Sequence, residues 1–414
     1  MDTLIKNIKK LVQTEDVQRK WVAGKDMAKL PSIDNAWLLI KDGLIADFGT
    51  MDNCPEVDEG TELDVQGRMV LPSFCDSHTH IVYPGSREIE YGDKIKGLSY
   101  EEIAKKGGGI LNSSKLLAET SSDDLYEQAL ERIHEIISFG TGAVEIKSGY
   151  GLDTENELKM LRVIRRLKET TPITIKANFL GAHSIPMEYR NDQTKFVDKV
   201  INEMIPAVAA EDLADYIDVF CDNGFFTVED TERILMAGMK YGMRGKIHAN
   251  ELDYSGGIQV GVKYNALSVD HLEFVGPEEI KALQGSETMP TVLPGAAFFL
   301  NMKSSPVRDM MNAGLPVALA SDYNPGSSPS GNMKFIMSLG CINYKMTPEE
   351  VINATTLNTA YAMGVQDELG SIARGKKANL IITKPIPSVE FLPYAYTSHL
   401  VEQVILNGEL VALD

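Results

Sequence analysis

The chain has 414 residues, 43% of them hydrophobic, so it can bury a large core, and its composition excludes a disordered or collagen-like protein. Its formal net charge of −19 argues against a nucleic-acid or anionic-membrane partner, because either would need a basic surface. The sequence has no apolar run of about 18 residues and no signal-peptide core, and its four cysteines are scattered, so we expect a cytoplasmic protein.

Short β-type runs separated by turn signals occupy both ends of the sequence. Between residues 36 and 70 the runs are AWLLIKDG, LIADFG and LDVQGRMVL, and they are punctuated as in hairpins. The C-terminal runs are GSIARGKKANLIIT and VEQVILNGELV, the second with an Asn-Gly turn. We expect the two ends to pair into one small β-sandwich-like domain that comprises residues 1–70 and 365–414.

Residues 71–364 alternate between apolar strand-like runs and helical patterns. The eight runs are VLPSFCDSH, GAVEIKS, TIKANFL, YIDVFCD, GKIHAN, ALSVDHL, TMPTVLP and VALASD. The helical patterns include SYEEIAKK, DDLYEQALERIHEIISF and ENELKMLRVIRRLKET. Continuously apolar runs are typical of parallel strands buried on both faces. The sequence therefore predicts an α/β protein with a TIM-type (β/α)8 barrel, whose functional residues would follow the carboxyl ends of the strands.

Histidines and an aspartate end several of these runs. His78 and His80 end the first run, and their i, i+2 spacing on a strand points both imidazoles to one face. His248 ends the fifth run, and Asp322 ends the eighth. Three imidazoles and one carboxylate suit Zn²⁺, and Fe or Mn less selectively. Such an ion lowers the pKa of a bound water from about 15.7 to about 7, so this set predicts a hydrolase that attacks its substrate with metal-bound hydroxide.

The remaining histidines fall into two groups. His183 follows the third run and His271 ends the sixth, so five of the seven histidines lie at the predicted functional rim. His134 lies in a predicted helix and His399 in the β-rich tail, and we interpret both as structural.

This ligand pattern resembles that of the amidohydrolase superfamily, whose members carry HxH after strand one, a histidine after strand five and an aspartate after strand eight. The resemblance spans essentially the whole chain and implies a homodimer with one divalent or trivalent metal ion, Zn or Fe, per subunit. Binuclear relatives carry a further ligand at strand four, where this sequence has Phe220-Cys221-Asp222-Asn223 and no lysine. Lys147 ends strand two instead, and we interpret it as a salt-bridged lysine at the rim.

Several stretches resemble one branch of this superfamily, which opens a cyclic amide in histidine breakdown. They are HIVYPGSREIEY, SYEEIAKKGGGI, EIKSGYGL, LGAHSIPMEY, IHANELDYSGG, SVDHLE, VLPGAAFF and SDYNPGSSP. The resemblance implies hydrolysis of the C–N bond of 4-imidazolone-5-propanoate to N-formimino-L-glutamate, a reaction on a small molecule that carries a carboxylate.

The same resemblance implies which residues bind the substrate. Arg87 would bind the propionate, since a planar guanidinium can grip a carboxylate through two hydrogen bonds. Tyr150 would contact the substrate through its hydroxyl, and His183 would donate a hydrogen bond to the ring carbonyl. The turn after strand eight would hold the product through Asn324, Gly326 and Ser327.

Several alternatives remain open at this stage. Arg87 could instead form a surface salt bridge with Glu88 or Glu90. Glu251, three residues after His248, could bind the substrate and accept a proton from the water or a ring nitrogen, or it could orient that histidine. The general base could be any of three groups, namely Glu251, His271 and Asp322.

Two other functions are compatible with the metal ligands. A deaminase or cyclic-imide hydrolase of the same superfamily, acting on another heterocycle, would share them, although a neutral base would not need Arg87. A non-catalytic scaffold relative is the second alternative, against which the intact ligand set argues.

Overall fold

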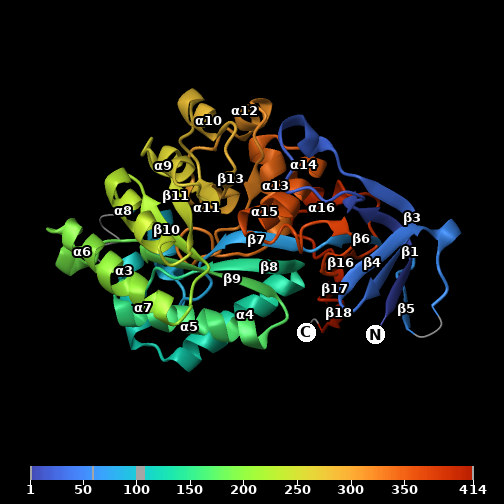
Figure 1. Cartoon of the computed structure of the whole chain (residues 1–414), viewed down its shortest axis with the longest axis horizontal. Coiled ribbons are helices and arrows are strands. Elements are labelled where there is room, and N and C mark those ends of the chain that lie inside the picture. The colour runs from blue at the N-terminus through green and yellow to red at the C-terminus, as the bar shows by residue number, and fades with distance from the viewer. Residues whose placement is uncertain (1, 58–59, 99–107, 413–414) are drawn as a thin grey trace.

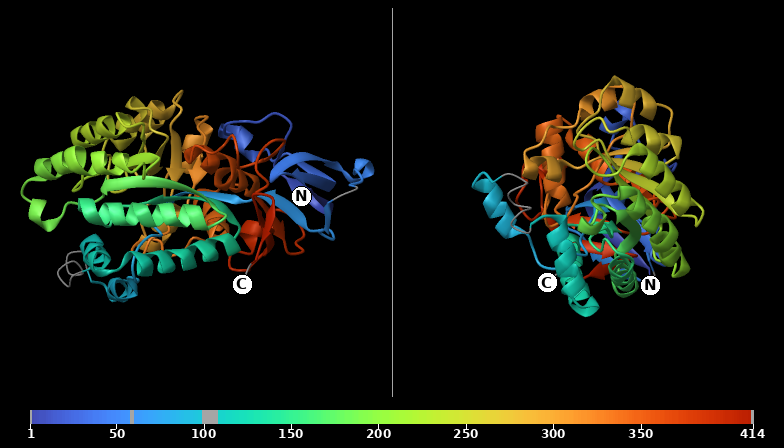
Figure 2. Two further views of the ribbon diagram at one scale, coloured as in Figure 1. Left: turned by 60° about the horizontal axis from the view of Figure 1, so that its bottom comes forward. Right: turned by 90° about the vertical axis from the view of Figure 1, so that its left-hand side faces the viewer.

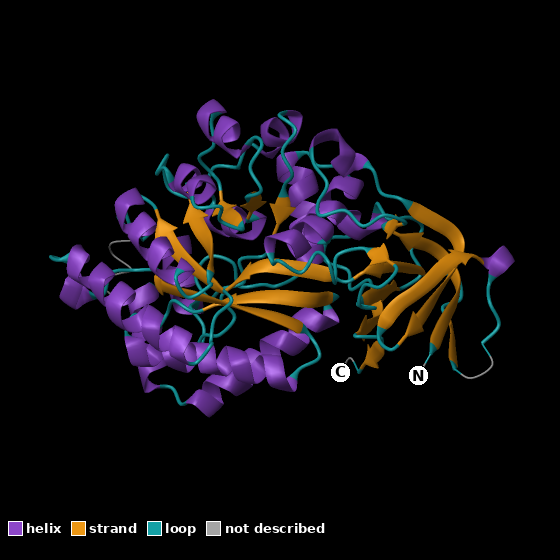
Figure 3. Cartoon of the chain, viewed as in Figure 1, coloured by secondary structure: helices purple, strands orange, loops and turns teal. Residues whose placement is uncertain are grey.

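The computed structural model of the chain describes residues 2–57, 60–98 and 108–412 (Figure 1). Its strands gather into two eight-stranded sheets, and a short two-stranded sheet pairs β2 (Thr14–Glu15) with β15 (Ile372–Ala373). Figure 3 shows that helices surround one of the large sheets, whereas the other forms a strand-rich body beside it. Among the described residues, no helix combines the length and the apolar character needed to cross a bilayer.

The first large sheet is the predicted barrel. Its eight parallel strands are hydrogen-bonded in chain order, and the two edges approach each other where Thr79 pairs with Tyr323. The strands are β7 (Phe74–Thr79), β8 (Thr141–Lys147), β9 (Thr174–Ala182), β10 (Tyr216–Cys221), β11 (Arg244–Ala249), β12 (Ser268–His271), β13 (Met289–Val292) and β14 (Ala318–Leu319). Nearly every residue of these strands is buried, as expected for a parallel sheet covered on both faces.

Helices connect the strands and cover the outside of the barrel (Figure 2). The helices are α1 (Glu88–Ile95), α3 (Ile110–Glu119), α4 (Ser122–Ser138), α5 (Thr154–Thr170), α6 (Gln193–Lys199), α7 (Ile205–Ala210), α8 (Val228–Met239), α9 (Gly257–Lys263), α10 (Pro277–Leu283), α11 (Pro294–Leu300), α12 (Val307–Asn312), α13 (Met333–Tyr344), α14 (Pro348–Thr355), α15 (Leu357–Ala362) and α16 (Phe391–Tyr394). Short turns of other helical type occupy η1 (Gly24–Ala28), η2 (Met51–Asn53), η3 (Met187–Tyr189) and η4 (Val200–Met204). The helices predicted for DDLYEQALERIHEIISF and ENELKMLRVIRRLKET are α4 and α5, and the one predicted for SYEEIAKK lies outside the described residues.

The second large sheet is built from both ends of the chain, as predicted. Its order is β18-β17-β16-β6-β1-β3-β4, and β5 also pairs with β1. The strands are β1 (Thr3–Val12), β3 (Ser32–Lys41), β4 (Leu44–Thr50), β5 (Thr61–Asp64), β6 (Met69–Pro72), β16 (Leu380–Thr383), β17 (Val401–Leu406) and β18 (Glu409–Val411). Asp42-Gly43 and Asn407-Gly408 make its hairpin turns, and all four residues have the positive φ of such turns. The division at residues 70 and 365 stays a prediction.

Two expectations about individual strands are wrong. The run VLPSFCDSH is not one strand, because β6 joins the terminal sheet and β7 joins the barrel. The change of sheet falls at Ser73, whose N–H donates to the carbonyl of Asn379. The run LDVQGRMVL is not a hairpin either, because β5 and β6 both pair with β1 in parallel. A continuous apolar run has the same residue pattern whether it stays in one sheet or passes between two.

Candidate active site

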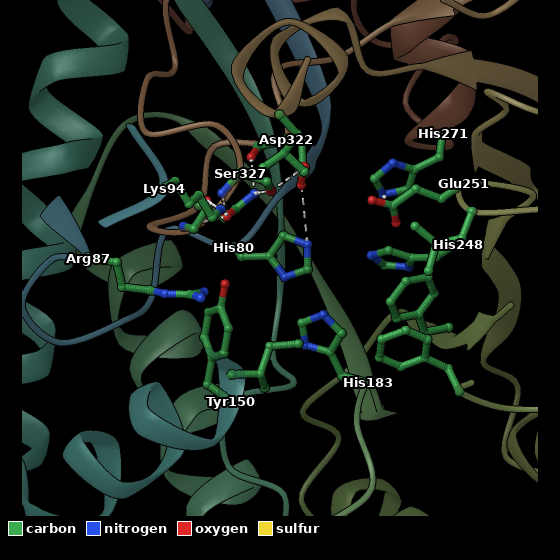
Figure 4. Close-up of a pocket in the computed structure, with 17 residues that line it drawn as sticks. His80, Arg87, Lys94, Tyr150, His183, His248, Glu251, His271, Asp322 and Ser327 are labelled. Atoms are coloured by element: carbon green, nitrogen blue, oxygen red, sulfur yellow. Dashed lines mark hydrogen bonds and ion pairs between the residues drawn. The ribbon is translucent and has the colours of Figure 1, made fainter. Parts of the chain in front are cut away.

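One cavity of about 350 Å³ opens at the carboxyl ends of the barrel strands (Figure 4). All the site residues predicted from the sequence line this cavity, with the exception of His78, which is fully buried behind it. The lining residues from that prediction are His80, Arg87, Tyr150, His183, His248, Glu251, His271, Asp322, Asn324, Gly326 and Ser327. The fold therefore brings together side chains that are spread over some 250 positions of the sequence, from about 80 to about 327.

The near-closure of the barrel places Asp322 beside the two histidines of β7. The backbone N–H of Asp322 donates to the carbonyl of His78 at 3.0 Å, and the N–H of His80 donates to the carbonyl of Tyr323 at 2.9 Å. Oδ1 of Asp322 then lies 3.5 Å from Nε2 of both histidines. Asp322 has φ +54°, a conformation that L-residues seldom adopt and that often marks functional positions.

Two buried carboxylates orient the rings of His78 and His248. Nδ1 of His78 donates to Asp270 at 2.6 Å, and Nδ1 of His248 donates to Asp218 at 3.1 Å. With the proton on Nδ1, the Nε2 atom of each ring carries a lone pair, and Nε2 of His248 is buried without a hydrogen-bond partner among the described residues. Carboxylate–histidine pairs of this kind commonly fix the ligands of a metal ion.

The charges of this cluster fit a bound cation. Burial raises the pKa of Asp322 to about 7 and holds the pKa of His78 and of His80 well below the ordinary histidine value. The cluster therefore has a buried carboxylate and neutral rings but no positive charge of its own. A bound metal ion would supply that positive charge. The potential ligand atoms form two groups that share His78, one with His80 and Asp322 and the other with His248 and His271. His271, expected only as a proton carrier, is thus also placed among the potential ligands.

Lys147 is ion-paired, as predicted, but it does not lie at the rim. Its ammonium is fully buried in the barrel interior, 2.6 Å from Glu145 and 2.8 Å from Asp218. The same ammonium is 3.9 Å from Asp270. This buried lysine thus pairs with the carboxylate that orients His248 and lies near the one that orients His78, and the rim assignment is corrected to an interior one.

Comparison with known proteins agrees with this fold and site. Residues 69–411 match the model of the amidohydrolase family. The imidazolonepropionase of Flavobacterium johnsoniae is 56% identical over 411 residues, which cover 99% of this chain and 100% of that protein. The imidazolonepropionases of Christiangramia forsetii and Caldanaerobacter subterraneus are 53% and 42% identical, covering 99% and 98% of this chain and 100% and 96% of those proteins. The chain belongs to the imidazolonepropionase family.

Solved structures with much lower identity share the fold of this imidazolonepropionase family member. Guanine deaminase of E. coli superposes with a TM-score of 0.74 at 13% identity, covering 100% of this chain and 99% of that one. A 5-methylcytosine deaminase from Klebsiella pneumoniae gives 0.74 at 19% identity, covering 99% and 98%. The amidohydrolase family is metal-dependent, in agreement with the histidine-rich cluster of this imidazolonepropionase family member.

Arg87 lines the cavity and also forms the salt bridge considered as its alternative. Its Nε and Nη2 donate to one oxygen of Glu90 at 2.9 and 2.6 Å, and both side chains are only 12% exposed. Its Nη1 faces Gly326 so closely that a Cβ on that glycine would lie 2.2 Å away. The guanidinium is therefore fixed from two sides, and its Nη1 N–H groups are not used by Glu90.

His183 is placed to accept a hydrogen bond, and not to donate one as expected. Its Nδ1 lies 3.0 Å from the carbonyl oxygen of Gly149, which can only accept, so Nδ1 carries the proton. Burial and the neighbouring His248 lower the pKa of His183 to about 3, which keeps the ring neutral. The Nε2 atom consequently has a lone pair, which suits a ring N–H better than a ring carbonyl.

The loop that carries Tyr150 is pinned by one buried carboxylate. Glu157 on α5 accepts hydrogen bonds from the N–H groups of Gly149, Gly151 and Leu152 at 3.0, 2.7 and 3.0 Å. Gly151 packs so tightly that a Cβ would lie 2.3 Å from the backbone nitrogen of Glu157. Burial raises the pKa of Glu157 to about 7. These contacts hold Tyr150 against the cavity.

Glu251 and His271 lie on the side of the cavity opposite Arg87 (Figure 4). Oε2 of Glu251 lies 3.6 Å from Nε2 of His271. Burial raises the pKa of Glu251 to about 8, and the negative charge of Asp322 adds to this effect. Oε2 of Glu273 lies 3.9 Å from Nδ1 of His271, and within the described part of the chain both carboxylate oxygens of Glu273 are buried without hydrogen-bond partners.

The turn after β14 uses its polar side chains mainly to hold its own shape. Oδ1 of Asn324 accepts from the N–H groups of Gly326 and Ser327, both at 2.8 Å. Nδ2 of Asn324 donates to the carbonyl of Asp322 at 2.7 Å, and Oγ of Ser327 donates to the carboxylate of Asp322 at 3.2 Å. In this structure these residues therefore orient Asp322 and shape the wall against which Arg87 rests.

Sequence reasoning missed several residues that build this site. Asp218 and Asp270 interrupt apolar strand runs, and a charge in a strand buried on both faces was a usable signal for an interior partner. Glu157 and Glu273 had no such signal, because their neighbours are set by loops. Lys94 lines the cavity from α1, where its sequence context resembles an ordinary exposed helix surface.

Proposed function

We propose that the chain hydrolyses the cyclic amide of 4-imidazolone-5-propanoate to N-formimino-L-glutamate. The observation that carries this proposal is the division of one cavity between Arg87 on one side and the cluster of His80, His248 and Asp322 across from it (Figure 4). A ring whose propionate lies on Arg87 would extend its carbonyl toward the histidines. The relatives named imidazolonepropionase, which match nearly the full chain, support the same substrate.

We further propose one zinc or iron ion in each subunit of a homodimer, with four ligands from β7, β11 and the segment after β14. The ligands are His78, His80, His248 and Asp322. When bound, such an ion supplies Lewis-acid chemistry and lowers the pKa of a water in its coordination shell. The carboxylates of Asp218 and Asp270 keep two of the imidazoles turned toward the site.

The substrate would be held by groups at three points of the cavity. Arg87 binds the carboxylate through its Nη1 edge, and the Tyr150 hydroxyl contacts the same arm of the substrate. His183 accepts a hydrogen bond from a ring N–H, which fixes the rotation of the ring. Phe220 and Phe225 stack with ring centroids 4.0 Å apart and line the cavity, so they exclude water beside the heterocycle.

Hydrolysis requires one proton to leave the attacking water and one to reach the ring nitrogen as the C–N bond breaks. Asp322 belongs to the metal ligands, so we assign proton transfer to Glu251 and His271. The Glu251 carboxylate receives the proton of the water and returns it to the departing nitrogen. His271, with its Nε2 3.6 Å from Glu251, orients that carboxylate and shares the proton.

Two variants test this proposal through different measurements. His248→Ala should lose bound metal and activity together. Arg87→Ala should keep its metal but raise KM for 4-imidazolone-5-propanoate about 10- to 100-fold, the scale of lost charge-assisted hydrogen bonds. Unchanged kinetics of Arg87→Ala on this substrate would contradict the substrate assignment, and full activity of a metal-free His248→Ala would contradict the mechanism.

A further inference from the structure

Arg87 is accompanied by a second cation, Lys94, at the same side of the cavity. Both residues belong to the segment of α1, and Figure 4 shows them together across from His248. Lys94 Nζ lies 3.4 Å from the carbonyl oxygen of Gly326, and Arg87 Nη1 occupies the space beside the same glycine, 2.2 Å from where a Cβ would lie. Both cations thus lie beside Gly326 in the turn after β14, and both line the cavity.

Among the described residues, the side chains of Arg87, Glu90 and Lys94 together carry one net positive charge. Glu90 accepts two hydrogen bonds from Arg87, so these two side chains together are neutral. Lys94 forms no ion pair within the part of the chain that the structure describes, and its polar contact there is the neutral carbonyl of Gly326. Burial, and then the charge of Arg87, lower the pKa of Lys94. The excess positive charge at this side of the cavity therefore comes from Lys94.

We propose that Lys94 is a specificity-determining residue, which forms with Arg87 a two-cation receptor for the anionic arm of the substrate. This inference rests on the proposed function and narrows its substrate class to ring amides that carry a carboxylate. Arg87 can donate hydrogen bonds to a carboxylate or to a neutral carboxamide, and Glu90 already offsets its charge. The ammonium of Lys94 feels the charge of Glu90 but forms no ion pair among the described residues, so it favours the charged arm over a neutral one of the same shape.

A purely structural role is the competing account. Lys94 lies in the last turn of α1, where a cation stabilises the helix dipole, and its contact with Gly326 could simply hold the turn. The two accounts differ in one respect. A structural lysine affects charged and neutral substrates alike, whereas a charge receptor affects only the charged one.

The test compares 4-imidazolone-5-propanoate with its neutral carboxamide in steady-state kinetics on the metal-replete protein. Lys94→Met removes the charge and keeps an extended side chain, and Lys94→Arg restores a charge. Lys96→Met is the matched control. It removes a positive charge two residues further along, at the end of α1, where the side chain is 73% exposed. KM and kcat are measured for each variant with both substrates, at low and high salt.

Lys94→Met should raise KM for the propanoate about 10- to 100-fold with little change in kcat, since a group that binds the arm contributes equally to ground state and transition state. Its KM for the carboxamide should stay within about twofold of the wild type, and the salt dependence of KM for the propanoate should weaken. Lys94→Arg and Lys96→Met should resemble the wild type. Equal changes for both substrates, or none for the propanoate, would overturn the inference. Absence of wild-type turnover of the propanoate would instead overturn the proposed function.

Discussion

The backbone N–H of Asp322 donates a hydrogen bond of 3.0 Å to the carbonyl oxygen of His78, so the near-closure of the barrel also sets two proposed metal ligands side by side. His78 belongs to the first barrel strand, and Asp322 follows the last. A cation held by both side chains would tie the two edges of the sheet together. Metal binding should therefore be linked to the stability of the barrel.

Removal of the metal should lower the stability of the folded protein. A metal at a free concentration of about 100 times its Kd adds about 2.7 kcal/mol to the free energy of unfolding, provided that the unfolded chain does not bind it. Denaturant unfolding with and without a chelator measures this difference. His248→Ala should abolish the gain, whereas His134→Ala, on the exposed side of α4, should keep it. Equal stability of the wild type in both conditions would contradict the linkage.

Gly326→Ala should weaken substrate binding without unfolding the protein. The new Cβ would lie 2.2 Å from Nη1 and 2.8 Å from Cζ of Arg87, so the guanidinium must move away from the turn. Gly326 is not among the glycines with positive φ, and we therefore expect a change in stability of less than about 1 kcal/mol. KM should rise about tenfold with kcat nearly unchanged. Gly92→Ala, where a Cβ meets open space, is the control. A KM equal to that of the wild type would show that Arg87 does not need its present position.

Asp270→Asn should weaken metal binding although Asp270 is not itself a ligand. Its carboxylate accepts the Nδ1 proton of His78 at 2.6 Å and thereby fixes the ring. Loss of such a partner commonly weakens metal affinity about 10- to 100-fold. Competition with a chelator measures the dissociation constant. Asp215→Asn removes a carboxylate that pairs with Lys176 at 3.0 Å, away from the site, and should leave the affinity unchanged. Equal affinities of Asp270→Asn and the wild type would rule out this orienting role.

The stability of the wild type should fall relative to Glu157→Gln as the pH rises from about 4.5 to about 7. Burial raises the pKa of Glu157 from the ordinary 4.5 to about 7, so the folded protein holds this proton more tightly than the unfolded chain does. Below about pH 4.5 both states are protonated, and between that pH and about 7 the unfolded chain releases its proton first. The relative loss should approach about 3 kcal/mol above pH 7, because one pKa unit corresponds to about 1.4 kcal/mol.

Denaturant unfolding of both proteins at a series of pH values from about 4 to 8 measures this difference. Glu155→Gln is the matched control, because it lies on the same helix with a side chain that is 84% exposed. Its stability relative to the wild type should not vary with pH. A constant difference between the wild type and Glu157→Gln over the same range would show that folding leaves the pKa of this carboxyl unchanged.

The sequence predicted the barrel because its strands and helices carry strong local signals. The strands are continuously apolar, and long helices such as α4 begin at capping residues, with the Ser121 side chain accepting from the N–H of Asp124. The passage of residues 69–79 between two sheets could not be predicted, because both strands are equally buried. Parallel pairing of β5 and β6 with β1 depends on long-range contacts that leave no local pattern.

The residues of the site were predicted better than the ways in which they act. Histidines at strand ends could be placed by fold geometry, and the cavity brings them together with Arg87. The proton position on His183 could not be predicted, because it depends on the carbonyl of Gly149, which lies 34 positions away in the chain. The interior position of Lys147 depends likewise on Asp218, which lies two strands away on β10 and 71 positions later in the chain.

Incubation of the purified, metal-replete protein with fresh 4-imidazolone-5-propanoate tests the central claim most directly. The account predicts a product heavier than the substrate by one water, with the ring opened and two carboxylates, and it predicts no turnover after chelation until zinc or iron is restored. A replete protein that forms no such product, or one that releases ammonia while the ring stays closed, would contradict the account.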